Sequence, residues 1–183
     1  MTTTTEAYIA RPNGSIALEP ITYSPPAAHE LLVEIVSASL CHTDVKAAAG
    51  AFKLPPPLIL GHEAAGYVRA TGDKVEDVKV GDAVVLSYAS CGKCRRCVSG
   101  KVAFCDLLGS LNFSGRREGG DAVVRDGKGK EVNGMFFGQS SMGRMALVKE
   151  RCVVKIESDP GRDELKKFAA LACGIQTGAG AIL

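Results

Sequence analysis

Four cysteines lie close together in the stretch CGKCRRCVSGKVAFC, residues 91–105. Their spacing is Cys-x2-Cys-x2-Cys-x7-Cys, and the residues are Cys91, Cys94, Cys97 and Cys105. Short loops of this kind can direct successive thiolates at one centre, and four thiolates are a ligand set of tetrahedral structural zinc. A closed shell of four sulfur ligands leaves no position for a substrate. The pattern therefore predicts a zinc site that stabilises a loop.

A disulfide framework and an iron–sulfur cluster are the alternative interpretations of this stretch. The chain has 183 residues and 7 cysteines, an odd number that cannot pair completely within one molecule, although a partial set of disulfides stays open. The N-terminal sequence MTTTTEAYIARPNGS lacks the charged start and apolar run of a secretory signal, so reduced thiols are expected. Bacterial ferredoxins use Cys-x2-Cys-x2-Cys-x3-Cys-Pro, whereas here the last gap is longer and Asp106 follows. Structural zinc is the favoured interpretation.

Charge and hydropathy exclude some classes of partner. Lys and Arg number 22 against 20 Asp and Glu, a formal net charge of +2, which is too balanced for a nucleic-acid-binding surface. No apolar stretch approaches the roughly 18 to 20 residues that a membrane span requires. Hydrophobic residues make up 46% of the chain, which is typical of a packed globular protein. We expect a cytoplasmic protein without a nucleic-acid or membrane partner.

Short apolar runs predict a mainly β fold. The runs are LLVEIVSASL, AAGYVRATG, DAVVLSYA, RMALVKE and CVVKIES. Their length and their bounding glycine, proline and polar residues are typical of strands. Together they predict a β-rich barrel or sandwich with few helices.

Two other segments have a different character. The polar, glycine-rich segment 107–134 predicts a loop with one hairpin, with a turn at Asn133 and Gly134. Further on, DELKKFAALACG has helix-forming residues, charges near its start and a glycine after its last apolar turn. This punctuation predicts a helix from near Asp163 to near Cys173.

A second set of candidate metal ligands is spread along the chain. SLCHTD, GHEAAG and LACGIQTG contain Cys41, His62 and Cys173. Two thiolates and one imidazole give catalytic zinc three protein ligands and an open fourth position. The separations mean that only folding could unite them. The residues alone leave another interpretation open, because buried cysteines are commonly core residues and a lone histidine is often merely hydrogen-bonded.

The residues around His62 form the pattern Gly-His-Glu-x2-Gly-x5-Gly-x2-Val, read here at Gly61, His62, Glu63, Gly66, Gly72 and Val75. This pattern resembles the signature of zinc-containing medium-chain alcohol dehydrogenases. The four-cysteine stretch resembles their structural-zinc lobe, and the ending CGIQTGAGAIL is most similar to the aryl-alcohol or benzyl-alcohol dehydrogenase branch. The resemblance extends over essentially all of the chain.

The resemblance implies a GroES-like, partly open β-barrel. Residues 1–160 would be the catalytic domain, with the structural-zinc lobe around residues 88–110. Residues 161–183 would be the linking helix and the start of the connection to a coenzyme domain. A dinucleotide-binding unit is marked by a strand, Gly-x-Gly-x-x-Gly, a helix and an acidic residue about 20 residues later. GIQTGAGAIL does not match that pattern, so we expect a chain that stops before its Rossmann domain, with an incomplete NAD site.

The resemblance also implies a metal-binding role for the second constellation. Cys41, His62 and Cys173 would bind catalytic zinc, and Glu63 would be a neighbouring carboxylate able to approach the metal. Asp44 would accept the second N–H of the zinc-bound histidine and so fix its tautomer. A helix-capping or turn role is the alternative for Asp44.

Three further residues acquire roles only through the resemblance. Thr43 would contact the reacting alcohol and begin a proton relay. His42 would lie near the coenzyme pyrophosphate, and Thr177 beside the nicotinamide. Lys46 stands where many members have the histidine that ends the relay, so the proton is expected to leave by another route or more slowly.

The implied activity is reversible oxidation of a primary, aromatic alcohol to an aldehyde, with hydride transfer to NAD and zinc as Lewis acid. Two alternatives stay open. The first is an inactive zinc-binding fragment without a coenzyme domain. The second is a related zinc dehydrogenase that acts on formaldehyde conjugates or sugar alcohols. The expected partner is a small alcohol or aldehyde, and full-length relatives are homo-oligomers.

Overall fold

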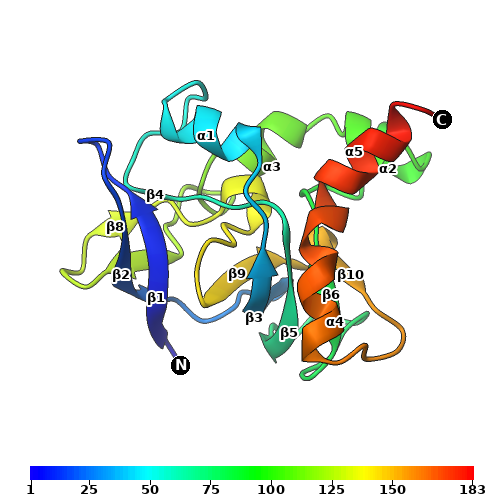
Figure 1. Ribbon diagram of the computed structural model, residues 1–183, viewed down its shortest axis with the longest axis horizontal. Helices are drawn as coiled ribbons and strands as arrows, with labels where there is room; N and C mark the ends of the chain where they lie inside the picture. Colours follow the sequence, from blue (N-terminus) through cyan, green and yellow to red (C-terminus); the bar gives the residue numbers. More distant parts are fainter.

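Two five-stranded sheets dominate the computed structural model, which describes residues 1–183 (Figure 1). The first sheet has the order β4-β1-β2-β7-β8 and the second the order β10-β6-β5-β3-β9, with every neighbouring pair antiparallel. The strands are β1 Thr3–Ala10, β2 Ile16–Tyr23, β3 Glu30–Ala38, β4 Leu58–Ile59, β5 Ala64–Thr71, β6 Ala83–Leu86, β7 Val124–Asp126, β8 Glu131–Val132, β9 Met145–Lys149 and β10 Val153–Lys155. The predicted mainly β fold is confirmed, and all five apolar runs form strands.

Short helices lie at the ends of the strands. The α-helices are α1 His42–Ala48, α2 Arg95–Val98, α3 Leu108–Phe113, α4 Arg162–Leu165 and α5 Gly174–Gly180. The 3₁₀ segments are η1 Val102–Phe104, η2 Phe136–Gly138, η3 Glu150–Cys152 and η4 Lys166–Ala172. Figure 1 shows α1 and α3 at one end of the strands, α4 beside the second sheet, and α5 beyond the end of that sheet near the C-terminus. None of these helices has the length and apolar character needed to cross a membrane.

The two sheets curl toward each other and are joined along one edge. β1 pairs with β2 on one side, and on the other the Tyr8 N–H donates to the Met142 carbonyl at 2.9 Å. The Arg144 N–H donates to the Glu6 carbonyl at 3.0 Å, so the segment that leads into β9 continues the hydrogen bonding of β1. The result is the near-barrel that a GroES-like domain requires.

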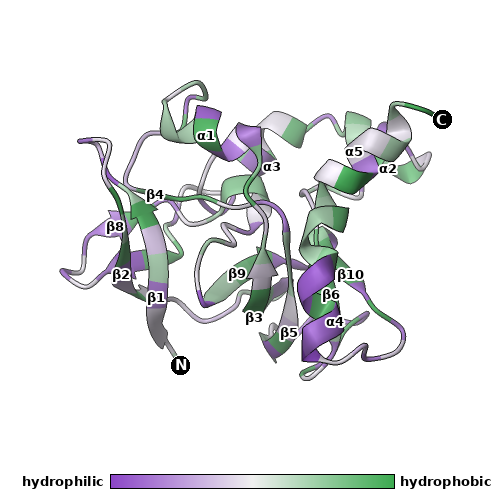
Figure 2. Ribbon diagram, in the orientation of Figure 1, coloured by the Kyte–Doolittle hydropathy of each residue, from purple (hydrophilic) through white to green (hydrophobic).

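The core follows from the alternation of side chains along β3 and β9. Leu32 and Leu147 face a cluster between the two sheets, which includes Ile9, Ile21 and Tyr23. Their neighbours face the opposite side of the second sheet, because successive side chains of a strand point to opposite faces. That second cluster contains Leu31, Val33, Val68, Val84, Ala146 and Val148. Figure 2 shows hydrophobic colouring along these strands.

The hairpin in the 107–134 segment exists, but its predicted turn at Asn133 and Gly134 is wrong. β7 and β8 are joined by residues 127–130, where the Asp126 carboxylate accepts the N–H groups of Lys128 and Lys130, each at 3.0 Å. Asn133 instead continues the strand and bonds through its backbone to residues 57 and 59. The Asp126 carboxylate stabilises the turn through these hydrogen bonds, and they place the hairpin turn at residues 127–130.

The predicted helix from Asp163 to Cys173 is also corrected. It is divided into α4 and the 3₁₀ segment η4, and it ends where Cys173 adopts φ −142° and ψ −66°. A further helix, α5, follows it. Leu165 and Ala172 are buried against Ala65 and Val85 of the second sheet. Packing against a sheet outweighs the preference of the sequence for a continuous α-helix.

Candidate metal centres and active site

The four cysteines of the first stretch converge on one point. The Sγ atoms of Cys91, Cys94, Cys97 and Cys105 all lie within 4.8 Å of one another, and those of Cys91 and Cys97 are 3.9 Å apart. Tetrahedral zinc with Zn–S bonds of about 2.3 Å separates its sulfur ligands by about 3.8 Å. The spacing of these sulfurs therefore fits a zinc ion with four thiolate ligands.

Local backbone geometry prepares these thiols for a metal. The Cys94 N–H donates to Cys91 Sγ at 3.3 Å, and the Cys97 N–H donates to Cys94 Sγ at 3.4 Å as α2 begins. N–H groups of Lys93 and Cys94 lower the pKa of Cys91 to about 6, because they stabilise its thiolate. Burial raises the pKa of Cys97 to about 11. A metal ion bound here would therefore have to displace a proton from the Cys97 thiol.

The four-cysteine lobe is attached to the barrel by a buried amide. Asn112 of α3 is 1% exposed. Its side chain accepts the Ala89 N–H at 2.8 Å and donates to the Ala89 carbonyl at 2.9 Å. Cys97 and Cys105 pack against Ala89 and against Cys152, a buried cysteine that is not in the sulfur cluster. The lobe is thus fixed at its base by both hydrogen bonds and packing.

The second constellation also comes together. Ligand atoms of Cys41, His62, Glu63 and Cys173 all lie within 4.8 Å of one another. Cys41 immediately precedes α1, the two central residues immediately precede β5, and Cys173 lies between η4 and α5. Three segments far apart in the sequence therefore supply one site. Folding brings together residues that were only candidate ligands in the sequence.

Asp44 fixes the orientation of the histidine. The carboxylate is fully buried, and His62 Nδ1 lies 3.1 Å from Asp44 Oδ1. The same carboxylate accepts the N–H of Gly61 at 2.9 Å and that of Cys41 at 3.0 Å. Since Asp44 is an acceptor, Nδ1 carries the proton and Nε2 keeps its lone pair. The Asp44 side chain contacts both the histidine ring, as the orienting role requires, and the Cys41 N–H, as the alternative capping role requires.

The free nitrogen of His62 provides a test of fit for a metal. His62 is 2% exposed, and its Nε2 is buried without any hydrogen-bond partner. A buried polar atom without a partner is costly, so such atoms usually have a bonding role. Two thiols, an imidazole lone pair and a carboxylate are typical zinc ligands. The residues present fit that ion.

Burial and neighbouring groups shift the titration of the site. Burial opposes protonation of His62, but the hydrogen bond and charge of Asp44 outweigh it and the pKa of His62 is raised. Burial also opposes ionisation of Cys41, but the hydrogen bonds from Thr43, together with the nearby His62 ring, outweigh it and the pKa of Cys41 is lowered. At Cys173, burial and the nearby charges of Cys41 and Glu63 raise the pKa to about 11.

The other predicted site residues lie around this set. Thr43 is half-buried beside Cys41, whereas His42 and Lys46 are exposed on α1. Thr177 is exposed on α5, with its hydroxyl oxygen 3.9 Å from Cys173 Sγ. Their roles toward alcohol and coenzyme stay predictions.

Aromatic residues that the sequence did not single out flank the histidine. The Phe137 ring stacks on the His62 ring with 4.6 Å between centroids, and Phe136 meets it edge-on at 5.8 Å. Phe113 lies 5.2 Å from Phe137 and stacks on Phe52 at 4.8 Å. The paired phenylalanines of GMFFG were the one available signal, and nothing in their spacing points to His62.

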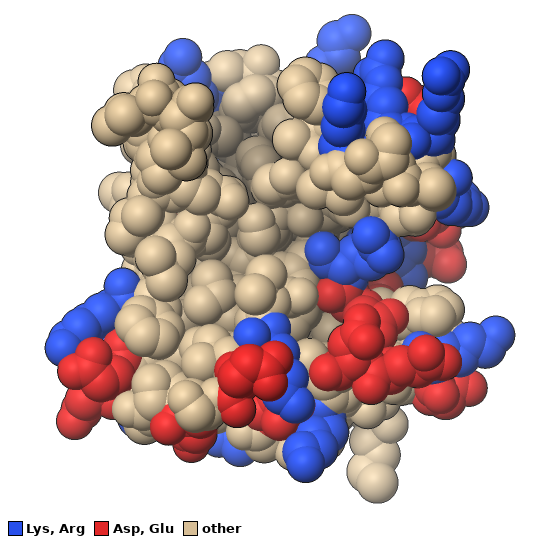
Figure 3. Space-filling model, turned by 90° about the vertical axis from the view of Figure 1, so that its right-hand side faces the viewer, with Lys and Arg blue, Asp and Glu red and all other residues tan.

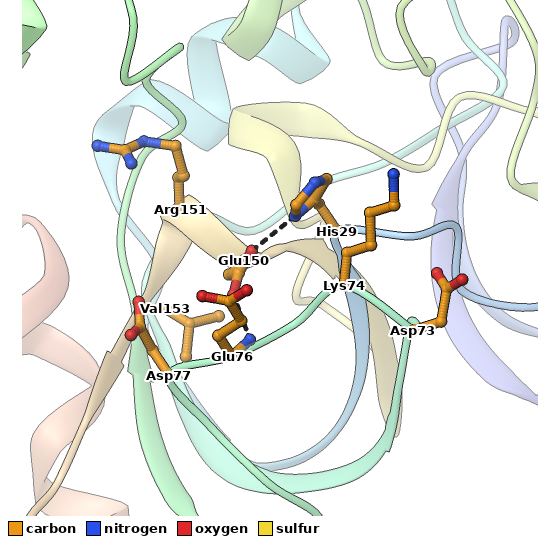
Figure 4. A pocket seen from close by; sticks show the side chains of 8 residues that line it. All are labelled: His29, Asp73, Lys74, Glu76, Asp77, Glu150, Arg151 and Val153. Carbon is orange, nitrogen blue, oxygen red and sulfur yellow. Dashed lines mark hydrogen bonds and ion pairs between the residues drawn. The ribbon is translucent and has the colours of Figure 1, made fainter.

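The surface elsewhere has hollows without such chemistry. One of about 570 Å³ is lined by exposed charged groups, and Figure 4 shows His29 paired with Glu150 at 3.1 Å at its edge. None of the metal-ligand candidates lines it. Figure 3 shows, on the face with the C-terminal helices, a mostly uncharged centre bordered by Lys, Arg, Asp and Glu.

Comparisons with known proteins agree with this geometry. The alcohol dehydrogenase GroES-like domain matches residues 27–158. Geraniol dehydrogenase of Castellaniella defragrans is 42% identical over 177 residues, which are 97% of this chain and 46% of the relative. The chain spans about half the length of the curated relatives it matches.

Solved structures give the same result. An alcohol dehydrogenase zinc-binding domain protein from Burkholderia ambifaria has a TM-score of 0.93 and 39% identity, over 99% of this chain and 48% of its own. Benzyl alcohol dehydrogenase from Acinetobacter calcoaceticus has a TM-score of 0.87 and 36% identity, over 98% and 47%. The chain therefore belongs to the zinc-type medium-chain alcohol dehydrogenase family and contains its GroES-like domain.

Proposed function

We propose that these residues form the metal-binding and alcohol-binding part of an NAD-linked dehydrogenase that oxidises primary, aromatic alcohols to aldehydes. The observation that carries the proposal is the unpartnered Nε2 of His62, which lies among Cys41, Glu63 and Cys173. Asp44 holds the imidazole with this lone pair available. Such an arrangement supplies a metal site with protein ligands and room for one exogenous oxygen.

Cys41, His62 and Cys173 hold the catalytic zinc, and Cys91, Cys94, Cys97 and Cys105 hold the structural one. When bound at the Cys41–His62–Cys173 set, zinc acts as a Lewis acid that lowers the pKa of an alcohol hydroxyl. Glu63 is 4% exposed and lies within reach of the same point, so it can exchange with the exogenous ligand. The Cys41–His62–Cys173 set therefore serves catalysis, whereas the four-cysteine set serves to stabilise its lobe.

Proton and coenzyme positions follow from the surroundings of the set. Thr43 accepts the proton of the alcohol at its hydroxyl oxygen and releases its own hydroxyl proton, since this hydroxyl lies in the first turn of α1 beside Cys41. The proton then leaves along the exposed side of α1, where Lys46 offers no neutral imidazole. His42 contacts the coenzyme pyrophosphate, and Thr177 faces the nicotinamide.

Aromatic contacts support the choice of substrate. Phe52, Phe113 and Phe137 are half-buried; Phe137 stacks on the His62 ring, Phe113 contacts Phe137, and Phe52 stacks on Phe113. Aromatic pairs contribute about 0.5–1.5 kcal/mol beyond the area they bury. Geraniol and benzyl alcohol, named in two relatives, are primary alcohols with an unsaturated carbon next to the carbinol. A flat, unsaturated alcohol would pack well against these phenylalanine rings, which form an aromatic wall.

Domain division, assembly and location are further parts of the proposal. Residues 1–160 form the catalytic domain with its lobe around residues 88–110, and residues 161–183 connect it to a coenzyme domain. The whole protein is a cytoplasmic homo-oligomer. Since the chain spans about half of its relatives, hydride transfer to NAD is assigned to the full-length assembly.

Zinc content and NADH binding, measured together, test the proposal. Elemental analysis of the purified chain is expected to give two zincs, one of which is lost in Cys41→Ser and the other in Cys94→Ser. NADH fluorescence titration then asks whether the chain alone binds coenzyme. Zinc without NADH binding supports the metal-binding part and assigns the coenzyme contacts to additional residues. Retention of both zincs in either variant would contradict the ligand assignment of the corresponding set.

Substrate choice needs the full-length protein. Benzyl alcohol, geraniol and a glutathione conjugate of formaldehyde are compared by kcat/KM with NAD. A higher value for the unsaturated alcohols supports the aromatic wall, and a Phe137→Leu variant should reduce that preference. Preference for the conjugate would contradict it.

A further inference from the structure

One buried side-chain amide outside both metal-ligand sets contacts the backbone of His62, a candidate metal ligand. Gln139 is 0% exposed. Its Nε2 donates to the His62 carbonyl at 3.0 Å and to the Ser87 carbonyl at 2.6 Å. A primary amide has two N–H groups, so both are used. Gln139 therefore connects the segment before β5 to the end of β6.

The connection continues to a second ligand. Ser87 Oγ donates to the Ala172 carbonyl at 3.4 Å. Ala172 is the residue immediately before Cys173. A chain of three hydrogen bonds thus runs from the backbone of His62, through Gln139 and Ser87, to the peptide group that carries Cys173. β5 and β6 are already paired at Ala64 and Leu86, and these hydrogen bonds extend that pairing to the two metal-ligand residues.

The backbone around Gln139 is held in an unfavourable conformation. Phe137 has φ 54° and Ser140 has φ 51°, both in the left-handed region, where residues other than glycine are strained. Ser140 Oγ donates to the Ile59 carbonyl at 2.6 Å and accepts the Phe136 N–H at 2.8 Å. Such strain persists only where the surroundings over-determine it. The segment is fixed on both sides of Gln139.

The amide is costly as a packing residue. Gln139 Oε1 is buried without a partner, which an apolar side chain of similar size would avoid. What the glutamine adds over an apolar residue is its pair of N–H donors, and both are directed at the framework of the metal set.

We propose that Gln139 is a positioning residue that sets the spacing between His62 and Cys173 and thereby the metal affinity of the Cys41–His62–Cys173 set. The proposal rests on the function proposed above. Partners that orient metal ligands typically change metal affinity by about 10-fold to 100-fold when they are removed. The four-cysteine set makes no direct hydrogen bond with Gln139 and serves as an internal reference.

Cobalt titration of the metal-free, reduced chain tests this. Co²⁺ bound by four thiolates and Co²⁺ bound by two thiolates and an imidazole absorb at different wavelengths, so both affinities are read in one molecule. Cys41→Ser and Cys94→Ser assign the two spectra. We expect Gln139→Met to weaken the Cys41–His62–Cys173 set by about 10-fold to 100-fold and to leave the four-cysteine set unchanged.

A matched control separates positioning from stability. Asn112 is another buried amide with several backbone bonds, and it lies at the base of the lobe instead. Asn112→Leu should not weaken the Cys41–His62–Cys173 set. Equal weakening of this set in both variants would overturn the proposal, since general loosening would then explain the effect.

The remaining outcomes also decide. If the wild-type chain binds Co²⁺ only at the four cysteines, the proposed function fails and this inference with it. If wild type binds at both sets and Gln139→Met does so with unchanged affinities, the inference alone fails. If Gln139→Met does not fold, Ser87→Ala is used instead, since it removes only the hydrogen bond from Ser87 to the Ala172 carbonyl. It should weaken the same set to a smaller extent, and unchanged binding in it overturns the inference.

Discussion

Asp44 serves the backbone and the site with a single carboxylate. One oxygen accepts from His62 and the Gly61 N–H, and the other accepts the Cys41 N–H that begins α1. The family resemblance implied this carboxylate, with a capping or turn role as the alternative, and a histidine ligand needs an acceptor for its second N–H. Gln139 and Phe137 could not be predicted, because their contacts with His62 depend on a left-handed backbone that sequence periodicity does not encode.

Asp44→Asn should therefore lose more than a charge. The amide can replace only one of the two oxygens as an acceptor, so either the helix start or the histidine loses its partner. We expect the free energy of unfolding to fall by about 1–3 kcal/mol and metal affinity of the Cys41 set to fall by about 10-fold to 100-fold. Urea titration and cobalt titration measure the two effects. Asp163→Asn, at an exposed carboxylate, is the control; unchanged cobalt binding in Asp44→Asn would contradict the orienting role.

At the scale of elements, short helices depend on what they contact. α2 contains four residues, far fewer than the roughly 12 to 15 that an isolated helix needs. The lobe around it contains few large buried side chains besides its cysteines. The sequence predicted this lobe well, since its ligands are local. It predicted α4 and η4 less well, because sheet contacts decide their form.

Removal of zinc should release the lobe while the barrel stays folded. Arg95, Arg96 and Lys101 are exposed and would become accessible to trypsin in an extended conformation. We expect rapid cleavage between residues 93 and 101 after chelation or in Cys94→Ser, with far-UV circular dichroism nearly unchanged. Zinc-loaded wild type is the control. Resistance of the metal-free lobe to trypsin would show that packing alone maintains it.

An ion-pair cluster ties α4 to β3 and makes this contact sensitive to acid. Glu34 accepts from Arg162 at 2.7 Å and from Arg69 at 2.8 Å, and these bonds hold the pKa of Glu34 below its usual value. Its stabilising effect is complete above the unfolded pKa of about 4.3 and is lost as pH falls through the lower folded pKa. Thermal melts of Glu34→Gln should therefore show less loss of Tm below about pH 4.3 than wild type. Parallel curves for the two proteins would count against this contribution.

At the scale of the whole molecule, contacts between the sheets close the near-barrel. Tyr23 of β2 is fully buried and donates its hydroxyl to the carbonyl of Met145 in β9 at 3.1 Å. Burial raises the pKa of Tyr23, so the hydroxyl stays protonated as a donor. Strand identity was predictable from the apolar runs, but which strands meet across the interior was not, since pairing depends on contacts distant in sequence.

Tyr23→Phe isolates this contact, since it removes one hydroxyl and leaves the ring. The carbonyl of Met145 then stays buried without its donor, and we expect the free energy of unfolding to fall by about 0.5–1.5 kcal/mol. Urea denaturation measures the change. Tyr8→Phe, at a tyrosine that is 50% exposed, should have almost no effect. Equal stability of both variants would mean that water replaces the lost bond.

The wide separation of the second ligand set has a consequence for the order of events during synthesis. Cys91 to Cys105 emerge together, so their metal can bind once that short stretch has left the ribosome. Cys41 and His62 must wait for Cys173, which emerges much later and whose preceding residue, Ala172, accepts a hydrogen bond from Ser87 just after β6. A metal in the four-cysteine set would mark the folding of that short stretch, and a metal in the Cys41–His62–Cys173 set would mark the folding of the whole segment 41–173.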